Sequence, residues 1–188
     1  MEKIKKYFET YIGLSEQDWQ IVSSKLTLER FPKKALLLKK GQIERHVSFI
    51  EHGVVRYYIP GETKEVTFEI TFENAFAGAY DSFLTRLPSS YNVETITPAT
   101  LWQLTHDDVQ TIYRETKMGN LFGRLAAESL FLEKSKRELS LLTNTPEQRY
   151  LNLFTEHPEL IRKIPLKYIA SYIGVTPQTL SRIRKRIC

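Results

Sequence analysis

The C-terminal stretch from Ile164 to Cys188 constrains this chain most, because it reads as two short helices joined by a tight turn. Thr176 followed by Pro177 predicts a helix start. Threonine can cap free backbone N–H groups, and proline at the first helical position lacks an N–H that would otherwise be unpaired. Gly174 can adopt the left-handed conformation that ends the preceding helix. A helix is therefore expected on each side of this glycine.

Both predicted helices are amphipathic. At about 100° per residue, one face of the second helix is apolar (Leu180, Ile183, Ile187) and the other is polar and mostly cationic (Gln178, Ser181, Arg182, Lys185, Arg186). The first helix has a shorter apolar stripe (Leu166, Ile169, Ala170, Ile173). Two short helices, the second with a basic outward face, form an arrangement that lets a helix lie in the DNA major groove. The stretch is thus predicted to be a DNA-binding helix-turn-helix.

Positive charge is concentrated in the same region. Residues 161–188 hold seven Lys or Arg and no Asp or Glu, whereas the whole chain has a net charge of +5, so residues 1–160 sum to −2. Solubility alone would not require this asymmetry, but contact with phosphate would. The alternative at this point is a solvated amphipathic C-terminal helix that carries a charge run.

Composition excludes several classes of protein. With 188 residues, 41% apolar and 26% charged, the chain has the make-up of a soluble globular protein of one or two domains. No apolar run reaches the length of a membrane span, and the N-terminus lacks a signal core, so a cytoplasmic protein with no membrane partner is expected. Its one cysteine, Cys188, and its scattered histidines (His46, His52, His106, His157) give no metal-ligand spacing. Neither a metal nor another cofactor is expected.

The first two thirds of the chain alternate between helical and β-rich segments. Residues 1–26 predict two helices, the first with a packing face of Ile4, Tyr7, Phe8 and Tyr11. Residues 26–104 predict seven short strands at Thr27–Phe31, Ala35–Leu38, His46–His52, Val54–Ile59, Glu65–Thr71, Tyr91–Thr95 and Thr100–Leu104. Such short strands form a barrel or sandwich, and helices at both ends place the fold in the α+β class.

A long helix is predicted over Lys117–Leu142, after a short one at His106–Thr116. Steps of alternately three and four residues place apolar side chains along one seam, interrupted by Glu128 and Ser135: Met118, Leu121, Leu125, Leu132, Leu139 and Leu142. A seam of this length predicts a homodimer with this helix as its axis. The alternative is a helix buried wholly against its own β-domain.

The break at Thr143–Pro146 predicts the boundary of the C-terminal domain. Thr145 is the expected cap of a new helix, with Gln148 in the capping-box position, and the helix should run to about His157. It offers Tyr150, Leu151 and Phe154 to a small core. Three parts are therefore expected: a β-domain over 1–116, a dimerisation helix over 117–143 and a helix-turn-helix domain over 144–188.

Four segments together resemble the CRP/FNR family of bacterial transcription regulators: Phe31–Gln42, Phe49–Arg56, Asn74–Gly78 and, most specifically, Ile169–Ile187. The resemblance covers nearly the full length. It implies an N-terminal antiparallel β-roll, a jelly roll similar to cyclic nucleotide-binding domains, followed by the dimerisation helix and the helix-turn-helix. It also implies a homodimer that binds near-palindromic double-stranded DNA, with RNA polymerase as a further partner.

In this family the base-reading side chains lie at the start of the second helix of the motif. By position these are Thr176, Pro177, Gln178 and Arg182, to which we add Ser181. Arg182 suits a bidentate contact with guanine and Gln178 one with adenine. Phosphate contacts are expected from the remaining basic or hydroxyl side chains of the motif: Lys167, Thr179, Arg184, Lys185 and Arg186.

The sensor region departs from the relatives that bind cyclic AMP. Those relatives have Glu after the Gly that matches Gly78, where this chain has Ala79, and an Arg-Ser or Arg-Thr pair where this chain has Leu87–Tyr91. Without these groups a buried cyclic phosphate would be uncompensated, so cyclic AMP is not expected to bind. Another small effector could occupy an apolar pocket formed by Tyr57, Phe68, Phe76, Gly78, Tyr80 and Tyr91; the alternative is core packing, which is the more common role of such aromatic side chains.

Two other functions compete with DNA binding. One is a β-roll sensor whose main role is to bind a small molecule. The other is a metal-dependent β-roll enzyme, which needs clustered His and carboxylate ligands on adjacent strands. The predicted strands supply His46 and His52 alone, and no nucleophile–base pair is visible, so the chain is not expected to be an enzyme.

Overall fold

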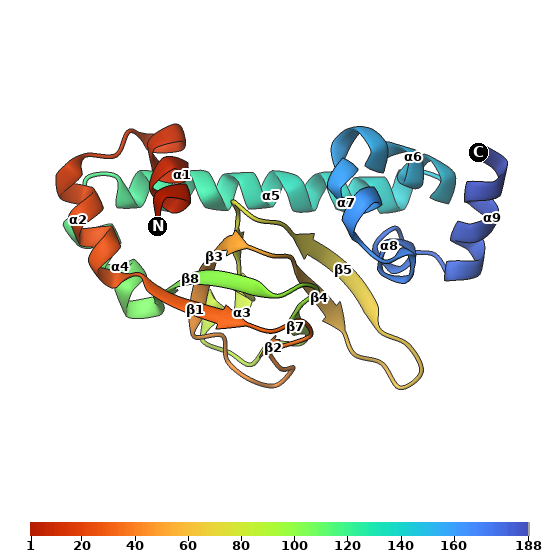
Figure 1. Ribbon diagram of the computed structural model, residues 1–188, viewed down its shortest axis with the longest axis horizontal. Coiled ribbons are helices and arrows are strands. Elements are labelled where there is room, and N and C mark those ends of the chain that lie inside the picture. The colour runs from red at the N-terminus through yellow and green to blue at the C-terminus, as the bar shows by residue number, and fades with distance from the viewer. Residues whose placement is uncertain (188) are drawn as a thin grey trace.

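A computed structural model describes residues 1–187 and shows a β-domain and two helical ends arranged along one long helix, α5 (Gly119–Thr143) (Figure 1). The chain forms the predicted α+β fold. Cys188, for which no metal-binding role was predicted, lies outside the described residues. No helix in residues 1–187 is both long and apolar enough to cross a membrane.

The N-terminal end consists of α1 (Glu2–Ile12) and α2 (Glu16–Lys25), which pack near α4 (His106–Glu115) and the start of α5. The hydroxyl of Ser15 caps α2 by accepting a hydrogen bond from the Asp18 N–H at 3.1 Å. Ile4 and Phe8 are buried, as expected. The placement of Tyr11 on the packing face is wrong, since Tyr11 is exposed and contacts the Tyr7 ring at the edge of the cluster.

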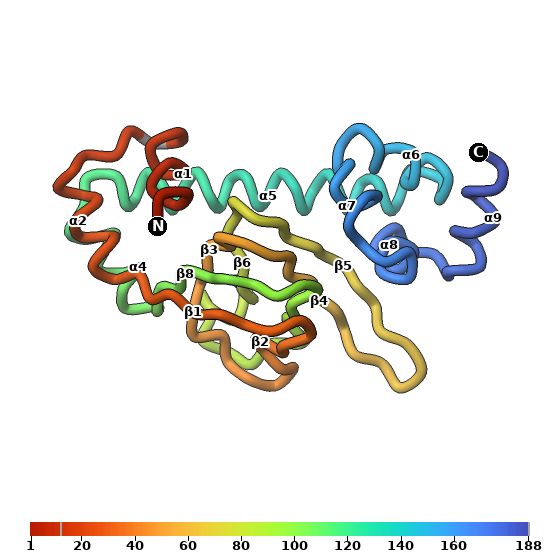
Figure 2. Tube along the Cα trace, viewed as in Figure 1, coloured from red at the N-terminus to blue at the C-terminus, as the bar shows by residue number. Residues whose placement is uncertain are grey.

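The β-domain consists of two four-stranded antiparallel sheets packed face to face. One has the order β1 (Thr27–Phe31), β8 (Ala99–Thr105), β3 (His46–His52) and β6 (Phe76–Ala77). The other has the order β2 (Leu36–Leu38), β7 (Asn92–Thr95), β4 (Val55–Ile59) and β5 (Val66–Thr71). Apolar side chains from both sheets fill the space between them: Leu38, Ile50, Val55, Tyr57, Val93 and Leu101. The β4–β5 hairpin extends beyond the rest of the domain, as Figure 2 shows.

Three short elements were missed by the sequence patterns. They are β6, α3 (Tyr80–Thr85) and α7 (Pro158–Lys163). Strand β6 has two residues and pairs only with β3, through Ser48–Ala77 and Phe49–Phe76. Elements this short have no periodicity to detect, and the tertiary contacts of their neighbours determine them.

The C-terminal domain consists of α6 (Pro146–Glu156), α7, α8 (Leu166–Tyr172) and α9 (Pro177–Ile187). The capping box at Thr145 is confirmed: its hydroxyl accepts from the Gln148 N–H at 3.3 Å, and the Gln148 side chain accepts from the Thr145 N–H at 2.9 Å. Tyr150 is buried, but the prediction that Leu151 and Phe154 enter the core is wrong. Leu153 takes that place, and the other two lie on the exposed side of α6.

Candidate nucleic-acid interface and sensor region

The turn between α8 and α9 has the predicted geometry. Gly174 adopts a φ of 76°, in the left-handed region. Thr176 caps α9, because its hydroxyl accepts a hydrogen bond from the Thr179 N–H at 3.2 Å. The two threonine hydroxyls also lie 3.0 Å apart. Both hydroxyls that sequence reasoning assigned to DNA are thus also engaged in starting the helix.

Helix α9 has one buried face and one exposed face. Leu180 and Ile183 are buried in the core of the C-terminal domain. The side chains on the opposite face are all exposed: Gln178, Ser181, Arg182 and Lys185. Among the described residues, no carboxylate lies within ion-pair distance of Arg182 or Lys185. This face therefore offers two cations and two neutral hydrogen-bonding groups to solvent.

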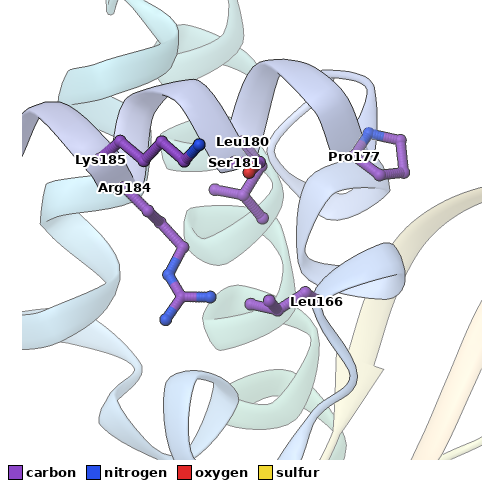
Figure 3. A pocket seen from close by; sticks show the side chains of 6 residues that line it. All are labelled: Leu166, Pro177, Leu180, Ser181, Arg184 and Lys185. Atoms are coloured by element: carbon purple, nitrogen blue, oxygen red, sulfur yellow. The ribbon is translucent and has the colours of Figure 1, made fainter.

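The flanks of α9 differ from its outer face. On one flank Arg186 forms a 3.2 Å ion pair with Glu147 at the start of α6, so this predicted phosphate contact already has a partner. On the other flank Arg184 lines a cavity of about 290 Å³ between α9 and the start of α8, which Ser181 and Lys185 of the outer face also line. Figure 3 shows Leu166 and Leu180 at this cavity, with the Arg184 side chain extending beside it. Lys167, the remaining predicted phosphate contact, is exposed at the start of α8.

Helix α5 carries an exposed apolar stripe. Leu132 is 66% exposed and Leu142 is 76% exposed, and Leu121 and Leu139 are also exposed. Phe131, which was not part of the predicted seam, is 71% exposed next to them. Leu125 is half-buried. Met118 lies outside the stripe, because it precedes the helix and is buried with α1, α2 and α4.

The predicted effector-pocket residues do not all lie together. Tyr57, Phe68 and Tyr91 lie together in the β-domain, with the Phe68 and Tyr91 ring centroids 4.9 Å apart. Phe76 instead packs against α1 and α5 in the N-terminal cluster, and Tyr80 stacks on Phe83 of α3. Placing Phe76 and Tyr80 with the others was therefore incorrect, because β6 and α3 direct them elsewhere.

Backbone donors around Gly78 are occupied from within the chain. The Gly78 N–H donates to the Tyr57 hydroxyl at 2.9 Å, and burial raises the pKa of Tyr57 to about 12 despite that bond. The buried carboxylate of Glu44 accepts from the Ala79 N–H at 3.1 Å and also from the N–H groups of Arg45 and His46. An anionic side chain of the protein itself thus occupies this group of backbone donors.

Arg56 joins the β-domain to the helix-turn-helix. Its side chain is 2% exposed, and its guanidinium lies 2.7 Å from Glu65 and 3.1 Å from Glu94. The guanidinium also lies between two aromatic rings, 3.9 Å from the centroid of Tyr58 and 4.1 Å from that of Tyr168 on α8. Sequence reasoning used Arg56 only as part of a motif. The sequence around Arg56 gave no indication that its side chain would contact Tyr168.

Further contacts hold the same junction. The hydroxyl of Ser171 on α8 accepts from the Thr67 N–H of β5 at 2.8 Å. Arg137 of α5 donates to the Tyr172 carbonyl at 2.7 Å. Val54, Ile70 and Ile96 of the β-domain belong to the same apolar cluster as the core of the C-terminal domain. The helix-turn-helix is therefore packed directly against the sheet that contains β4 and β5.

Within residues 1–187, no group of three or more His, Asp or Glu side chains is placed to hold a metal ion.

The sequence profile of the cyclic nucleotide-binding domain family matches residues 28–116. A search of curated proteins returns no significant match. Among solved structures, a mutant of CooA from Carboxydothermus hydrogenoformans is similar, with 17% identity and a TM-score of 0.72 over 96% of this chain and 83% of that one. FixK2 from Bradyrhizobium japonicum has 13% identity and a TM-score of 0.72, over 86% of this chain and 84% of that chain.

A transcriptional regulator of the CRP/FNR family from Eubacterium rectale is also similar, with 14% identity and a TM-score of 0.74. That match covers 97% of this chain and 87% of the other. At identities this low, the structural similarity establishes the fold alone. It does so over both the β-domain and the helix-turn-helix. Residues 28–116 therefore match the cyclic nucleotide-binding domain family, and the chain as a whole has a fold similar to that of the CRP/FNR regulators.

Proposed function

We propose that this protein is a sequence-specific, DNA-binding transcription regulator that acts as a homodimer and uses α9 to read the major groove. The observation that carries the proposal is the outer face of α9, where Gln178, Ser181, Arg182 and Lys185 are exposed together. A helix with this face can place a guanidinium and an amide against base edges while its apolar face stays packed.

Within this proposal the side chains of α9 have different roles. Arg182 and Gln178 contact bases, since both can make bidentate hydrogen bonds, and Ser181 supplements them. Lys185 and Lys167 contact phosphate, where charge fixes position without selecting sequence. Arg184 and Arg186 lie on the flanks, and Arg186 must leave Glu147 or share it to reach a phosphate.

The apolar stripe of α5 supports the homodimer. An exposed row that includes Phe131, Leu132 and Leu139 is costly to leave in water and suits the facing helix of a second copy. Two α9 helices related by a two-fold axis would meet half-sites about 34 Å apart, which implies a near-palindromic operator. In this scheme residues 1–116 form the sensor, 117–143 the dimer axis and 144–188 the DNA-binding domain.

The β-domain of this protein is proposed not to bind cyclic AMP. A cyclic phosphate in a pocket of this kind needs backbone donors and a cationic partner. Here the Glu44 carboxylate and the Tyr57 hydroxyl accept from the Ala79 and Gly78 N–H groups, and a second anion beside Glu44 would be repelled. Calorimetric titration with cyclic AMP should give no saturable heat.

A mobility-shift series with operator variants tests the division of roles on α9. Arg182→Ala should cost about 1–3 kcal/mol on the preferred operator and relax discrimination at one base pair. Lys185→Ala should weaken binding to all sequences alike and reduce the salt dependence. Equal losses that do not depend on sequence for both variants would contradict the assignment of Arg182 to base reading. Absence of any DNA binding by the intact dimer would refute the proposed function.

A further inference from the structure

A cleft lies where the β-domain meets the helix-turn-helix. Its volume is about 200 Å³. One wall comes from the turn between β1 and β2 and from the end of β7, and the other comes from the end of α7 and the start of α8. We call it the junction cleft and define it by its lining residues: Lys33, Lys34, Glu94, Ile96, Thr97, Lys163, Pro165, Lys167 and Tyr168.

Four lysines from two domains line the junction cleft. Lys33 and Lys34 belong to the β-domain, and Lys163 and Lys167 to the C-terminal domain. Among the residues described, Lys163 pairs with Glu159 at 2.7 Å, whereas Lys33, Lys34 and Lys167 have no carboxylate within 4.0 Å. The cleft therefore gathers more positive charge than the protein itself neutralises.

The single carboxylate in the lining does not balance these lysines. Glu94 accepts from the Arg56 Nε at 3.1 Å, so its charge is directed to a buried guanidinium behind the cleft. An anion in the cleft would meet ammonium groups from both sides, with the Thr97 hydroxyl on the same wall. Lysine ammonium groups bind phosphate as point charges with several rotatable donors.

We propose that the junction cleft binds a small molecule bearing a phosphate or diphosphate group, and that this anion regulates the DNA-binding function proposed above. The volume limits the ligand, because sites for drug-sized molecules span roughly 300–1,000 Å³. A diphosphate with a small organic group is therefore a better fit than a dinucleotide. The proposal rests on the proposed function only for its regulatory consequence, since the binding step needs no DNA.

The lining connects the ligand to the packing of the two domains. Glu94 and Tyr168 both line the cleft, and both also contact Arg56, which joins β4 to α8. A ligand held by Lys34 on one wall and Lys167 on the other binds this packed arrangement and not one in which the domains are apart. Binding therefore favours the packed arrangement and fixes the position of α9 relative to the dimer axis.

Calorimetric titration of the full chain with inorganic pyrophosphate at constant ionic strength tests the proposal. The wild type should bind one pyrophosphate per chain. The double variant Lys34→Gln/Lys167→Gln should bind at least about tenfold more weakly, because it removes one charge-assisted partner from each wall. Lys6→Gln/Lys117→Gln removes the same charge from exposed positions outside the cleft and should bind as the wild type does.

Thermal melting without ligand checks that both double variants fold as the wild type does. No saturable binding by the wild type, or equal weakening in both double variants, would overturn the proposal, because the lysines would then act only through net charge.

A duplex-length series separates a free ligand from the DNA backbone as the source of phosphate. If pyrophosphate fails to bind while the cleft variant loses more affinity than Lys167→Gln alone, and this additional loss appears only for duplexes with long flanks, Lys34 contacts DNA and the small-molecule proposal is wrong. Saturable pyrophosphate binding that shifts operator affinity supports it. Wild-type protein that binds pyrophosphate but no DNA would leave the site in place and refute the proposed function alone.

Discussion

One buried guanidinium contacts both domains of this protein where they pack together. Arg56 has partners on β4, β5, β7 and α8, and its charge is balanced by Glu65 and Glu94. Arg56→Met should lower the free energy of unfolding by about 3 kcal/mol, because it leaves the Glu94 carboxylate without its partner in a largely buried position. Urea denaturation measures the change.

Arg124→Met provides the matched control for this substitution. Arg124 forms an exposed ion pair with Glu128 on α5, so the same change should cost no more than about 0.5 kcal/mol. An equal cost at both sites would show that the buried pairs of Arg56 contribute no special stability.

Tyr57 gives the protein a pH dependence in alkaline solution. Burial raises the pKa of its hydroxyl from 10.0 to about 12, so the folded state favours the protonated form. Its contribution to stability is fully present below pH 10 and is lost as the pH rises toward 12. Urea unfolding at stepped pH should show this loss, and Tyr57→Phe should make it shallower. A slope unchanged by Tyr57→Phe would assign the effect to other buried tyrosines.

Burial of single side chains was the least predictable property at this scale. Phe131 and Tyr11 have the same sequence character as buried aromatic residues, yet both are exposed. Phe76 and Tyr80 were grouped with Tyr57 as the lining of one possible effector pocket, but β6 and α3 direct them to different neighbours. Whether an aromatic side chain is core or surface depends on which element covers it, and that is not encoded locally.

At the scale of elements, the starts of α6 and α9 were predicted to the residue, whereas α5 starts at Gly119 and not at the predicted Lys117. Thr145 and Thr176 cap their helices as expected, because capping joins a side chain to backbone groups two or three residues away. The short elements β6, α3 and α7 could not be predicted, since contacts distant in sequence determine them. The long strands and α5 have enough residues for their periodicity to be read.

The capping box of α6 should make a measurable contribution to stability. Thr145→Ala removes the acceptor of the Gln148 N–H and should lower the free energy of unfolding by about 1 kcal/mol. Thr155→Ala near the end of the same helix removes only a hydroxyl that donates to a local carbonyl and should cost less. Equal costs in urea denaturation would mean that the cap adds nothing beyond the loss of a hydroxyl.

At the scale of the whole molecule, the stripe on α5 should set the oligomeric state. Leu132→Glu/Leu139→Glu places two carboxylates in the proposed dimer axis, so sedimentation equilibrium should show a monomer for this variant and a dimer for the wild type. Thr63→Glu, exposed in the turn between β4 and β5 and not on α5, should leave the dimer intact. A double variant that stays dimeric would exclude this stripe as the axis.

The shared apolar cluster at the junction has a consequence for dissecting the protein. Val54, Ile70 and Ile96 complete the core around Leu160, Ile169 and Ile183. Cutting the chain at the end of α5 would therefore expose apolar surface on both fragments. The C-terminal fragment would lose part of the packing that keeps α8 and α9 in register. Replacing the C-terminal domain of this protein by another one would therefore also require changes in the sheet surface against which it packs.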